Sequence, residues 1–198
     1  MKILIGDIGN TLTKLCLFNE RSVIIKEYNV ETNKMIKEKN LIKFFKPFLT
    51  SSVKKKILFS SVVPKAYLKI KKFFKIKKYQ VYEIKKLSLK GLIKINIDKY
   101  NELGSDRIAN AIGAYSLYKK NCLIIDFGTA TTFDIVRNPG VYEGGVIAPG
   151  VKLSILNLNQ STASLPLLNL KIDTKTYGRN TKDALNAGFL WGYQGLVN

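Results

Sequence analysis

Two short segments, roughly 120 residues apart, contain the same order of residues with chemical potential. The first, Gly6 to Phe18, has the sequence GDIGNTLTKLCLF, and the second, Ile125 to Val136, has the sequence IDFGTATTFDIV. Each is an apolar run that ends in Asp, a spacer and Gly, followed by small hydroxyl or amide residues and a second apolar run. An Asp at the tip of a buried strand can hold a cation, and a Gly lets backbone amides approach a phosphate. The pair predicts two hairpins that bind a nucleotide triphosphate from both sides of one cleft.

The first hairpin has the groups that phosphoryl transfer needs. Asp7 offers a carboxylate near Mg²⁺, and Lys14 offers a cation for the phosphates. The turn between them offers amide and hydroxyl donors from Gly9, Asn10 and Thr11. An ordinary turn between strands could have the same sequence, because such turns are common. The second hairpin favours the functional interpretation, since a structural turn has no reason to repeat its carboxylate at the same point. Its corresponding residues are Asp126, Gly128, Thr129, Thr131 and Thr132.

A third candidate, the sequence LGSDR at Leu103 to Arg107, lies between the hairpins at the predicted start of a helix. Ser105 or Asp106 could simply be the N-cap of that helix. Alternatively, Asp106 could accept a proton from a substrate hydroxyl. A carboxylate is a weak base, but phosphoryl transfer tolerates one because positioning and charge neutralisation supply most of the rate.

Two later segments also have more than one interpretation. Glu143 to Gly150 is a glycine-rich strand and loop that could pack closely against a substrate or another subunit, or could be a bulged strand with a tight turn. Tyr177 to Thr181 precedes the last predicted helix. Thr181 could cap that helix or contact a ligand.

These residues must be positioned by alternating strands and helices. Apolar runs separated by turn residues predict an antiparallel meander near the N-terminus, formed by Lys2–Gly6, Thr13–Phe18 and Val23–Val30. A helix is predicted from Glu31 to Leu49, ended or broken at Pro47, and another from Pro64 to about Phe74. Further strands are predicted at Lys56–Val63, Tyr79–Ile84 and Leu92–Ile97.

The second half repeats part of this pattern after a helix predicted at Ser105–Tyr118. Its predicted strands are Cys122–Phe127, Thr131–Arg137 and Tyr142–Ile147, and its predicted helices are Lys152–Gln160 and Thr181 to the C-terminus. A chain of 198 residues fits two lobes of about 100 residues each, which we assign to residues 1–104 and 105–198. The order of strands and helices is complete only in the first lobe, so the second is expected to be truncated.

Composition excludes several classes of function. The chain has no histidine, which rules out a histidine base, a histidine metal ligand and a Ser-His triad. The net charge is +19, but only 4 of the 33 basic residues are arginine, the residue preferred for base and phosphate contacts, so nucleic-acid binding is not favoured. Cys16 and Cys122 lie in apolar strands and are interpreted as reduced core thiols. No apolar run of about 18 residues and no secretory signal occurs, which predicts a cytoplasmic protein without a membrane span.

Several of these motifs, in this order, resemble those of type III pantothenate kinases, which belong to the acetate and sugar kinase, Hsp70 and actin superfamily. The matching segments are GDIGNT, LGSDR, IDFGTATTFD, EGGVIAPG, SLP and GRNT. Linked motifs in the right order are far more specific than any one of them. The resemblance implies an α/β fold of two duplicated ribonuclease H-like (actin-like ATPase) lobes, each a mixed sheet flanked by helices. Family members normally also have a Thr-Gly-Gly element near the nucleotide, which this sequence lacks.

The resemblance also implies an activity, the ATP-dependent phosphorylation of pantothenate to 4'-phosphopantothenate in coenzyme A biosynthesis. It makes Asp106 the proton acceptor and Asp126 the ligand of a monovalent cation, potassium or ammonium, while Asp7 is a candidate Mg²⁺ ligand. It implies a homodimer, with Thr181 contacting pantothenate across the interface. The implied ATP-binding residues are Asp7, Ile8, Gly9, Asn10, Thr11, Leu12, Thr13, Lys14 and Thr129. The implied pantothenate-binding residues are Gly104, Ser105, Asp106, Arg107 and Thr181.

Two other functions fit the same residues. A non-catalytic or regulatory relative of the same fold would use the basic surface to bind anionic partners. A kinase of another small hydroxyl compound would keep the phosphate-binding hairpins and change the substrate. Retention of Asp7, Asp106, Arg107 and Asp126 favours a kinase, because a binding protein has no need of all four.

Overall fold

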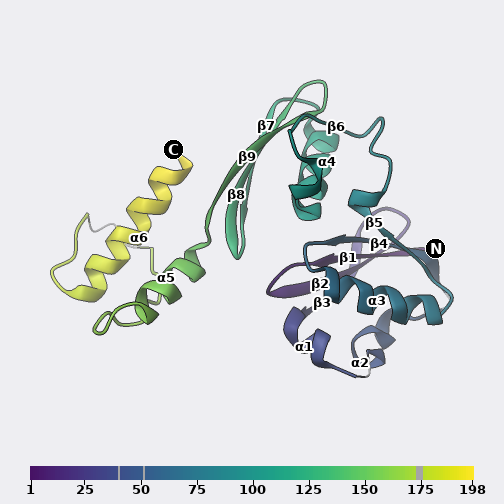
Figure 1. Ribbon diagram of the computed structural model, residues 1–198, viewed down its shortest axis with the longest axis horizontal. Helices are drawn as coiled ribbons and strands as arrows, with labels where there is room; N and C mark the ends of the chain where they lie inside the picture. The colour runs from purple at the N-terminus through teal and green to yellow at the C-terminus, as the bar shows by residue number, and fades with distance from the viewer. Residues whose placement is uncertain (40, 51, 173–175) are drawn as a thin grey trace. The chain divides into compact units, whose positions relative to one another are not determined.

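The computed structural model describes residues 1–39, 41–50, 52–172 and 176–198 (Figure 1). These residues form two compact units. The first unit comprises Met1–Ile124 and Asp134–Gly144, and the second comprises Ile125–Phe133 and Gly145–Asn198. The lobes predicted from the sequence, 1–104 and 105–198, describe an internal duplication and stay a prediction.

A five-stranded mixed sheet organises the first unit. Its strand order is β3-β2-β1-β4-β5, with β1 antiparallel to β2, β2 antiparallel to β3, and β4 parallel to both β1 and β5. The predicted antiparallel meander is therefore confirmed. Alternate residues of the two central hairpin strands, such as Leu4, Ile8, Leu15 and Leu17, are buried, as expected for strands with one face on a core. The strands are β1 (Lys2–Ile8), β2 (Leu12–Phe18), β3 (Ile24–Glu31), β4 (Val53–Ser61) and β5 (Gln80–Glu83).

The helix α3 (Pro64–Ile76) packs an apolar stripe against this sheet. Pro64 occupies its first turn, where a missing N–H does no harm. Phe74 is fully buried, and its ring centroid lies 4.9 Å from that of Phe45 and 6.2 Å from that of Phe59. Aromatic contacts of this kind are part of the hydrophobic core between the five-stranded sheet and its helices.

The prediction of one helix from Glu31 to Leu49 is wrong. The segment forms α1 (Thr32–Lys37), α2 (Ile42–Phe45) and a 3-10 turn at Lys46–Phe48, and α1 ends before Pro47 is reached. The amino group of Lys69, on α3, donates to the carbonyls of Ile36 and Glu38 at 2.5 and 2.6 Å, which satisfies the end of α1. A side chain distant in sequence therefore stabilises the end of this helix.

A four-stranded sheet follows, with the order β6-β9-β8-β7. It comprises β6 (Lys94–Ile95), β7 (Cys122–Phe127), β8 (Ala130–Arg137) and β9 (Val141–Pro149). β6 is parallel to β9, while the short loops between β7, β8 and β9 permit only antiparallel pairing. The order β9-β8-β7 repeats the order β3-β2-β1, as the duplicated hairpins predict. Only two residues of the strand predicted at Leu92–Ile97 pair with a neighbour.

The remaining α-helices of the described residues are α4 (Ser105–Tyr118), α5 (Val151–Gln160) and α6 (Thr181–Val197). The observed α/β architecture, two mixed sheets with helices, confirms the predicted fold class. Within the described ranges, no helix combines the length and the apolar character required to cross a membrane. Cys16 and Cys122 are free and half-buried, and burial raises the pKa of Cys16, which disfavours a reactive thiolate there.

Gly6, one residue before Asp7, packs directly on the sheet's core. A β-carbon built on Gly6 would lie 2.1 Å from the ring of Phe59, which is fully buried. We expect Gly6→Ala to destabilise the fold by about 1–3 kcal/mol through overpacking, measured by urea denaturation. Gly113→Ala on α4 is the control, because nothing lies within 4 Å of that position. Equal stability of the Gly6→Ala variant and the parent would contradict the tight packing.

Candidate active site

Thr32, the first residue of α1, forms hydrogen bonds with the backbone of the first hairpin's turn. The backbone N–H of Thr32 donates to the Thr11 carbonyl at 2.9 Å, and its hydroxyl donates to the Gly9 carbonyl at 2.7 Å. The same hydroxyl lies 3.1 Å from that of Thr13. The hairpin is thus an ordered structure in which a phosphate would meet preset amides.

The predicted ATP-binding residues of this hairpin divide into supporting and exposed side chains. Ile8 and Thr13 are fully buried and support the hairpin from its inner face. Asp7 and Lys14 pair across the ladder between β1 and β2. The side chains that reach solvent are those of Asn10, Thr11, Leu12 and Lys14.

The start of α4 lies beside the carboxyl ends of β1 and β4. The N–H of Val62, directly after β4, donates to the carbonyl of Ile8 at 3.1 Å. A β-carbon built on Gly104 would lie 3.5 Å from Cγ1 of the same Val62. The structure therefore brings the first hairpin and the LGSDR segment to one edge of the sheet. Open α/β sheets bind ligands outside this edge.

The carboxyl end of β5 holds the segment that leads into α4. The hydroxyl of Ser105, which is buried, donates to the carboxylate of Glu83. The amino group of Lys85 donates to the carbonyls of Asn101 and Leu103 at 2.7 and 2.6 Å. The sequence analysis missed both Glu83 and Lys85, since nothing local in a short strand and turn indicates a partner some 20 residues away.

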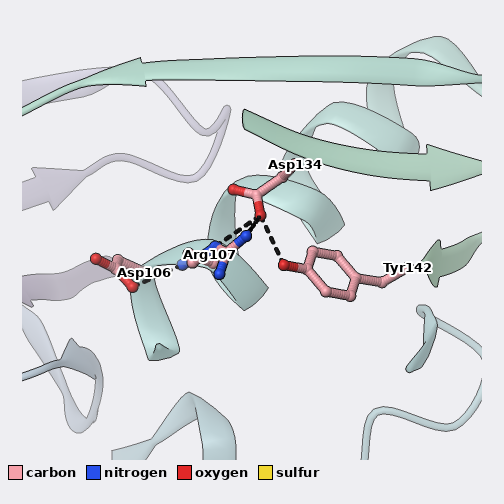
Figure 2. A network of polar contacts seen from close by, with 4 residues as sticks. All are labelled: Asp106, Arg107, Asp134 and Tyr142. Atoms are coloured by element: carbon pink, nitrogen blue, oxygen red, sulfur yellow. Dashed lines mark hydrogen bonds and ion pairs between the residues drawn. The ribbon is translucent and has the colours of Figure 1, made fainter. Parts of the chain in front are cut away.

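The N-cap interpretation of Ser105 and Asp106 is wrong. The N-cap residue of α4 is Gly104, and no side chain caps the helix there. Asp106 is half-buried, and its Oδ1 accepts a hydrogen bond from the backbone N–H of Arg107 at 2.8 Å (Figure 2). One oxygen of the Asp106 carboxylate is thus oriented by the backbone of the first turn of α4.

Gly104 leaves room for the Asp106 carboxylate. Its backbone angles are ordinary, but a β-carbon there would lie 2.3 Å from Oδ1 of Asp106. We expect Gly104→Ala to fold normally and to lower kcat by about tenfold, because the carboxylate must move by a fraction of an ångström or more. Steady-state kinetics, with Gly113→Ala on the same helix as the control, measures this. An unchanged kcat would show that the position of Asp106 is not critical.

The side chain of Arg107 is bound in a buried polar network (Figure 2). Its Nε donates to Oδ1 of Asp134 at 2.7 Å, and its Nη2 lies 2.7 Å from the same oxygen. The hydroxyl of Tyr142 donates to that oxygen at 2.6 Å, and the Tyr142 ring centroid lies 5.9 Å from Cζ of Arg107. Asp134 and Tyr142 are fully buried. Burial raises the pKa of both side chains, and the hydrogen bond to Asp134 raises the pKa of Tyr142 further.

The sequence analysis assigned no role to Asp134 or Tyr142. A signal for Asp134 was present, because a carboxylate inside the apolar run of β8 needs a partner to be buried there. No comparable signal marks Tyr142, since a tyrosine in a strand is common.

The second hairpin lies in the second unit, where the glycine-rich loop packs against its tip. The N–H of Gly128 donates to the Ala130 carbonyl at 2.9 Å, and the N–H of Gly150 donates to the Thr129 carbonyl at 3.1 Å. A β-carbon on Gly150 would lie 2.3 Å from the Gly128 carbonyl oxygen. The glycine at the end of this loop therefore packs on the hairpin backbone, while the predicted approach of the loop to a substrate or another subunit stays a prediction.

The predicted cation ligand, Asp126, is exposed on this hairpin, as are Gly128 and Thr129. Among the residues that the structure describes, no three or more His, Cys, Asp or Glu side chains form a metal-binding group. Carboxylate and carbonyl oxygens suit hard cations. The residues at this hairpin therefore fit an oxygen-bound ion better than a thiolate- or imidazole-bound metal.

The N-cap interpretation of Thr181 is also wrong, because Asn180 is the N-cap of α6 and its Oδ1 accepts from the Asp183 N–H at 3.0 Å. Thr181 is exposed and lines a groove of about 430 Å³. The other lining residues are Leu158, Leu165, Ala184, Leu185, Gly188 and Phe189. Thr181 is therefore accessible, and its contact with a substrate stays a prediction.

The predicted site residues are thus divided between the two units. The first unit contains Asp7 to Lys14 and Gly104 to Arg107, and the second contains Asp126, Thr129 and Thr181. A single cleft that joins the two hairpins stays a prediction.

Comparisons with known proteins agree on one family. The family model for type III pantothenate kinase matches residues 3–198. A Pelagibacter ubique type III pantothenate kinase is 46% identical over 202 residues, which cover 99% of this chain and 78% of that protein. A Methylacidiphilum infernorum protein of the same description is 34% identical over 195 residues, covering 98% of this chain and 68% of its own.

One solved structure supports the fold independently. A Campylobacter jejuni protein, described as a conserved member of the Baf family of transcriptional activators, superposes with a TM-score of 0.55 at 22% sequence identity. The superposition covers 98% of this chain and 77% of that one. At this level of identity, the likeness concerns the fold alone.

Proposed function

This chain belongs to the type III pantothenate kinase family, and we propose that Asp106 is the group that receives the proton when its substrate is phosphorylated. The reaction is ATP-dependent phosphorylation of pantothenate in coenzyme A biosynthesis. The observation that carries the role of Asp106 is its placement. Its carboxylate lies at the start of α4, over a glycine that leaves room for it, beside the carboxyl ends of β1 and β4.

The transfer needs little covalent help from the protein. A pantothenate hydroxyl oxygen attacks the γ-phosphorus of ATP, a new oxygen–phosphorus bond forms, and the bond to the bridging β–γ oxygen breaks to release ADP. The hydroxyl proton passes to the Asp106 carboxylate and then to solvent. Asp106 thus orients the hydroxyl and removes its proton as the bond forms.

The first hairpin is proposed to bind the phosphates of ATP. Its backbone amides are preset by the contacts of Thr32 with Gly9 and Thr11. Lys14 is exposed next to the turn and would neutralise phosphate charge. Asp7, paired with Lys14 across the ladder, is the proposed ligand of Mg²⁺, the divalent cation that accompanies ATP.

The second hairpin is proposed to bind a monovalent cation, potassium or ammonium, at Asp126, and ATP at Thr129. When bound, such a cation would supply positive charge near the nucleotide phosphates. The oxygen donors at this hairpin fit that class of ion. Gly150 would keep the tip of the hairpin in one position, because its backbone bonds to Thr129.

Thr181 is proposed to contact pantothenate across a homodimer interface. Exposed apolar side chains of the second unit offer surface that a second copy of the chain would cover in such a dimer. They include Val146, Ile147, Leu156, Trp191 and Leu196. Because the reaction uses ATP, we place it in the cytoplasm.

The decisive experiment measures ADP release from ATP and Mg²⁺ by the purified 198-residue chain. It is run with and without pantothenate, in potassium, ammonium and sodium buffers. Release that depends on pantothenate and on potassium or ammonium is expected. Release with other small hydroxyl compounds but not with pantothenate would indicate a different substrate. No release, together with salt-sensitive binding of anionic partners, would indicate a regulatory relative.

A further inference from the structure

The guanidinium of Arg107 contacts Asp134 at its edge and Tyr142 at its face. Oδ1 of Asp134 contacts both Nε and Nη2, and the ring of Tyr142 lies against the guanidinium. The Arg107 side chain is only 14% exposed, and that of Asp134 is fully buried. A buried ion pair of this kind is often no more stabilising than apolar residues of similar volume. Stability alone therefore gives no reason for the pair.

All these contacts converge on one oxygen of Asp134. Arg107 and Tyr142 both donate to Oδ1, whereas the buried Oδ2 has no hydrogen-bond partner among the described residues. The guanidinium has five N–H groups. Its Nε donates to Asp134, whereas the buried Nη2, 2.7 Å from the same oxygen, has no hydrogen-bond partner within the described part of the chain, so donors remain for a second anion. Pantothenate carries a carboxylate, the group that arginine binds best.

The same residue is linked to the proposed proton acceptor through the backbone. The Arg107 N–H donates to Oδ1 of Asp106 at 2.8 Å, within the first turn of α4. Any shift of the Arg107 side chain that moves its backbone also moves the donor that holds this carboxylate. The network thus connects two strands of the four-stranded sheet, through Asp134 on β8 and Tyr142 on β9, to the Asp106 carboxylate at the start of α4 (Figure 2).

We propose that Asp134 and Tyr142 are positioning residues for the reaction, which fix the Arg107 guanidinium for the substrate carboxylate and the Arg107 backbone for Asp106. This proposal rests on the proposed kinase function and on the contact with pantothenate that the family resemblance implies for Arg107. Neither Asp134 nor Tyr142 touches the reacting atoms. They act through Arg107, and their removal should affect pantothenate more than ATP.

Asp134→Asn is the sharpest variant, because an Asn oxygen can take the place of Oδ1 while the amide takes the place of the unpartnered Oδ2. It removes the charge and retains the acceptor. We expect KM for pantothenate to rise about tenfold and KM for ATP to stay within a factor of two. A variant that merely loosened the fold would change both constants. Unchanged KM for pantothenate in a folded Asp134→Asn protein would overturn the proposal.

Tyr142→Phe tests the same network with a smaller change, in case Asp134→Asn does not fold. It retains the ring against Arg107 and removes only the hydroxyl that donates to Asp134. We expect KM for pantothenate to rise about threefold. Tyr115→Phe is the matched control, because the Tyr115 hydroxyl, also in the first unit, donates instead to the exposed Asn138. Equal kinetics of the two Phe variants would contradict the proposal.

A spectroscopic measurement separates the network from the enzymatic activity. The chain has four arginines, and Arg21, Arg137 and Arg179 are exposed, so Arg107 should give the one slowly exchanging Nε–H signal in a ¹⁵N-labelled sample. We expect this signal in the wild type and its loss or shift in Asp134→Asn. If the wild type lacks kinase activity but shows this pattern, the proposed function fails and the network stands. If the signal is unchanged in Asp134→Asn, the network itself is refuted.

Discussion

Replacing Asp106 with Asn is expected to reduce kcat for pantothenate phosphorylation by about 10³-fold and to leave the fold intact. Asn retains the size of the side chain and an oxygen that can accept from the Arg107 N–H, as Asp106 does at 2.8 Å. It cannot accept a proton from the substrate hydroxyl. Because the variant preserves the packing against Gly104, the loss should appear in kcat and leave KM for ATP unchanged.

Steady-state kinetics and circular dichroism on the same samples provide the test. Glu27→Gln is a suitable control, since it makes the same chemical change at an exposed carboxylate on β3 of the same unit. Wild-type kcat in a folded Asp106→Asn protein would exclude Asp106 as the proton acceptor. Strong loss in Glu27→Gln would show instead that the enzyme is sensitive to charge in general.

The second large effect is expected at Asp126, where substitution by Asn should abolish the response of the rate to potassium. At saturating potassium, we expect a loss of about 100-fold, typical for removal of one electrostatic group from a transition-state site. The rate is measured across a series of potassium concentrations, with sodium replacing potassium to keep ionic strength constant. An activation curve like that of the parent would show that the cation binds elsewhere.

Local patterns were sufficient to predict the elements whose signals lie within the element itself. The helix at Ser105–Tyr118 and the strand at Cys122–Phe127 have the predicted bounds, because small and apolar residues recur with helical spacing in the first and form a continuous run in the second. The prediction of a single helix after Glu31 was wrong because the contacts there involve residues outside the segment. The end of α1 is stabilised by Lys69, more than 30 residues away, whose amino group binds the carbonyls of Ile36 and Glu38.

The candidate site shows the same division. The two hairpins and Asp106 were predicted because their residues recur or follow one another in the sequence. The side chains that bind the neighbours of Asp106 come from elsewhere in the sequence. Glu83 accepts a hydrogen bond from Ser105, and Asp134, itself bonded to Tyr142, accepts one from Arg107. A residue such as Ser105 has several ordinary roles at a helix start, and only its partner decides among them.

Gly150 connects the second hairpin to α5 within the second unit. It is the N-cap residue of α5, and its N–H is bonded to Thr129 at the tip of the second hairpin. On the other side, the Tyr193 hydroxyl of α6 donates to the Pro149 carbonyl and lies 2.8 Å from the Ser154 hydroxyl of α5. Backbone and side-chain hydrogen bonds therefore link the hairpin tip to both helices. The only tryptophan of the chain, Trp191, is on α6 and exposed, so its fluorescence can report a change in the surroundings of that helix.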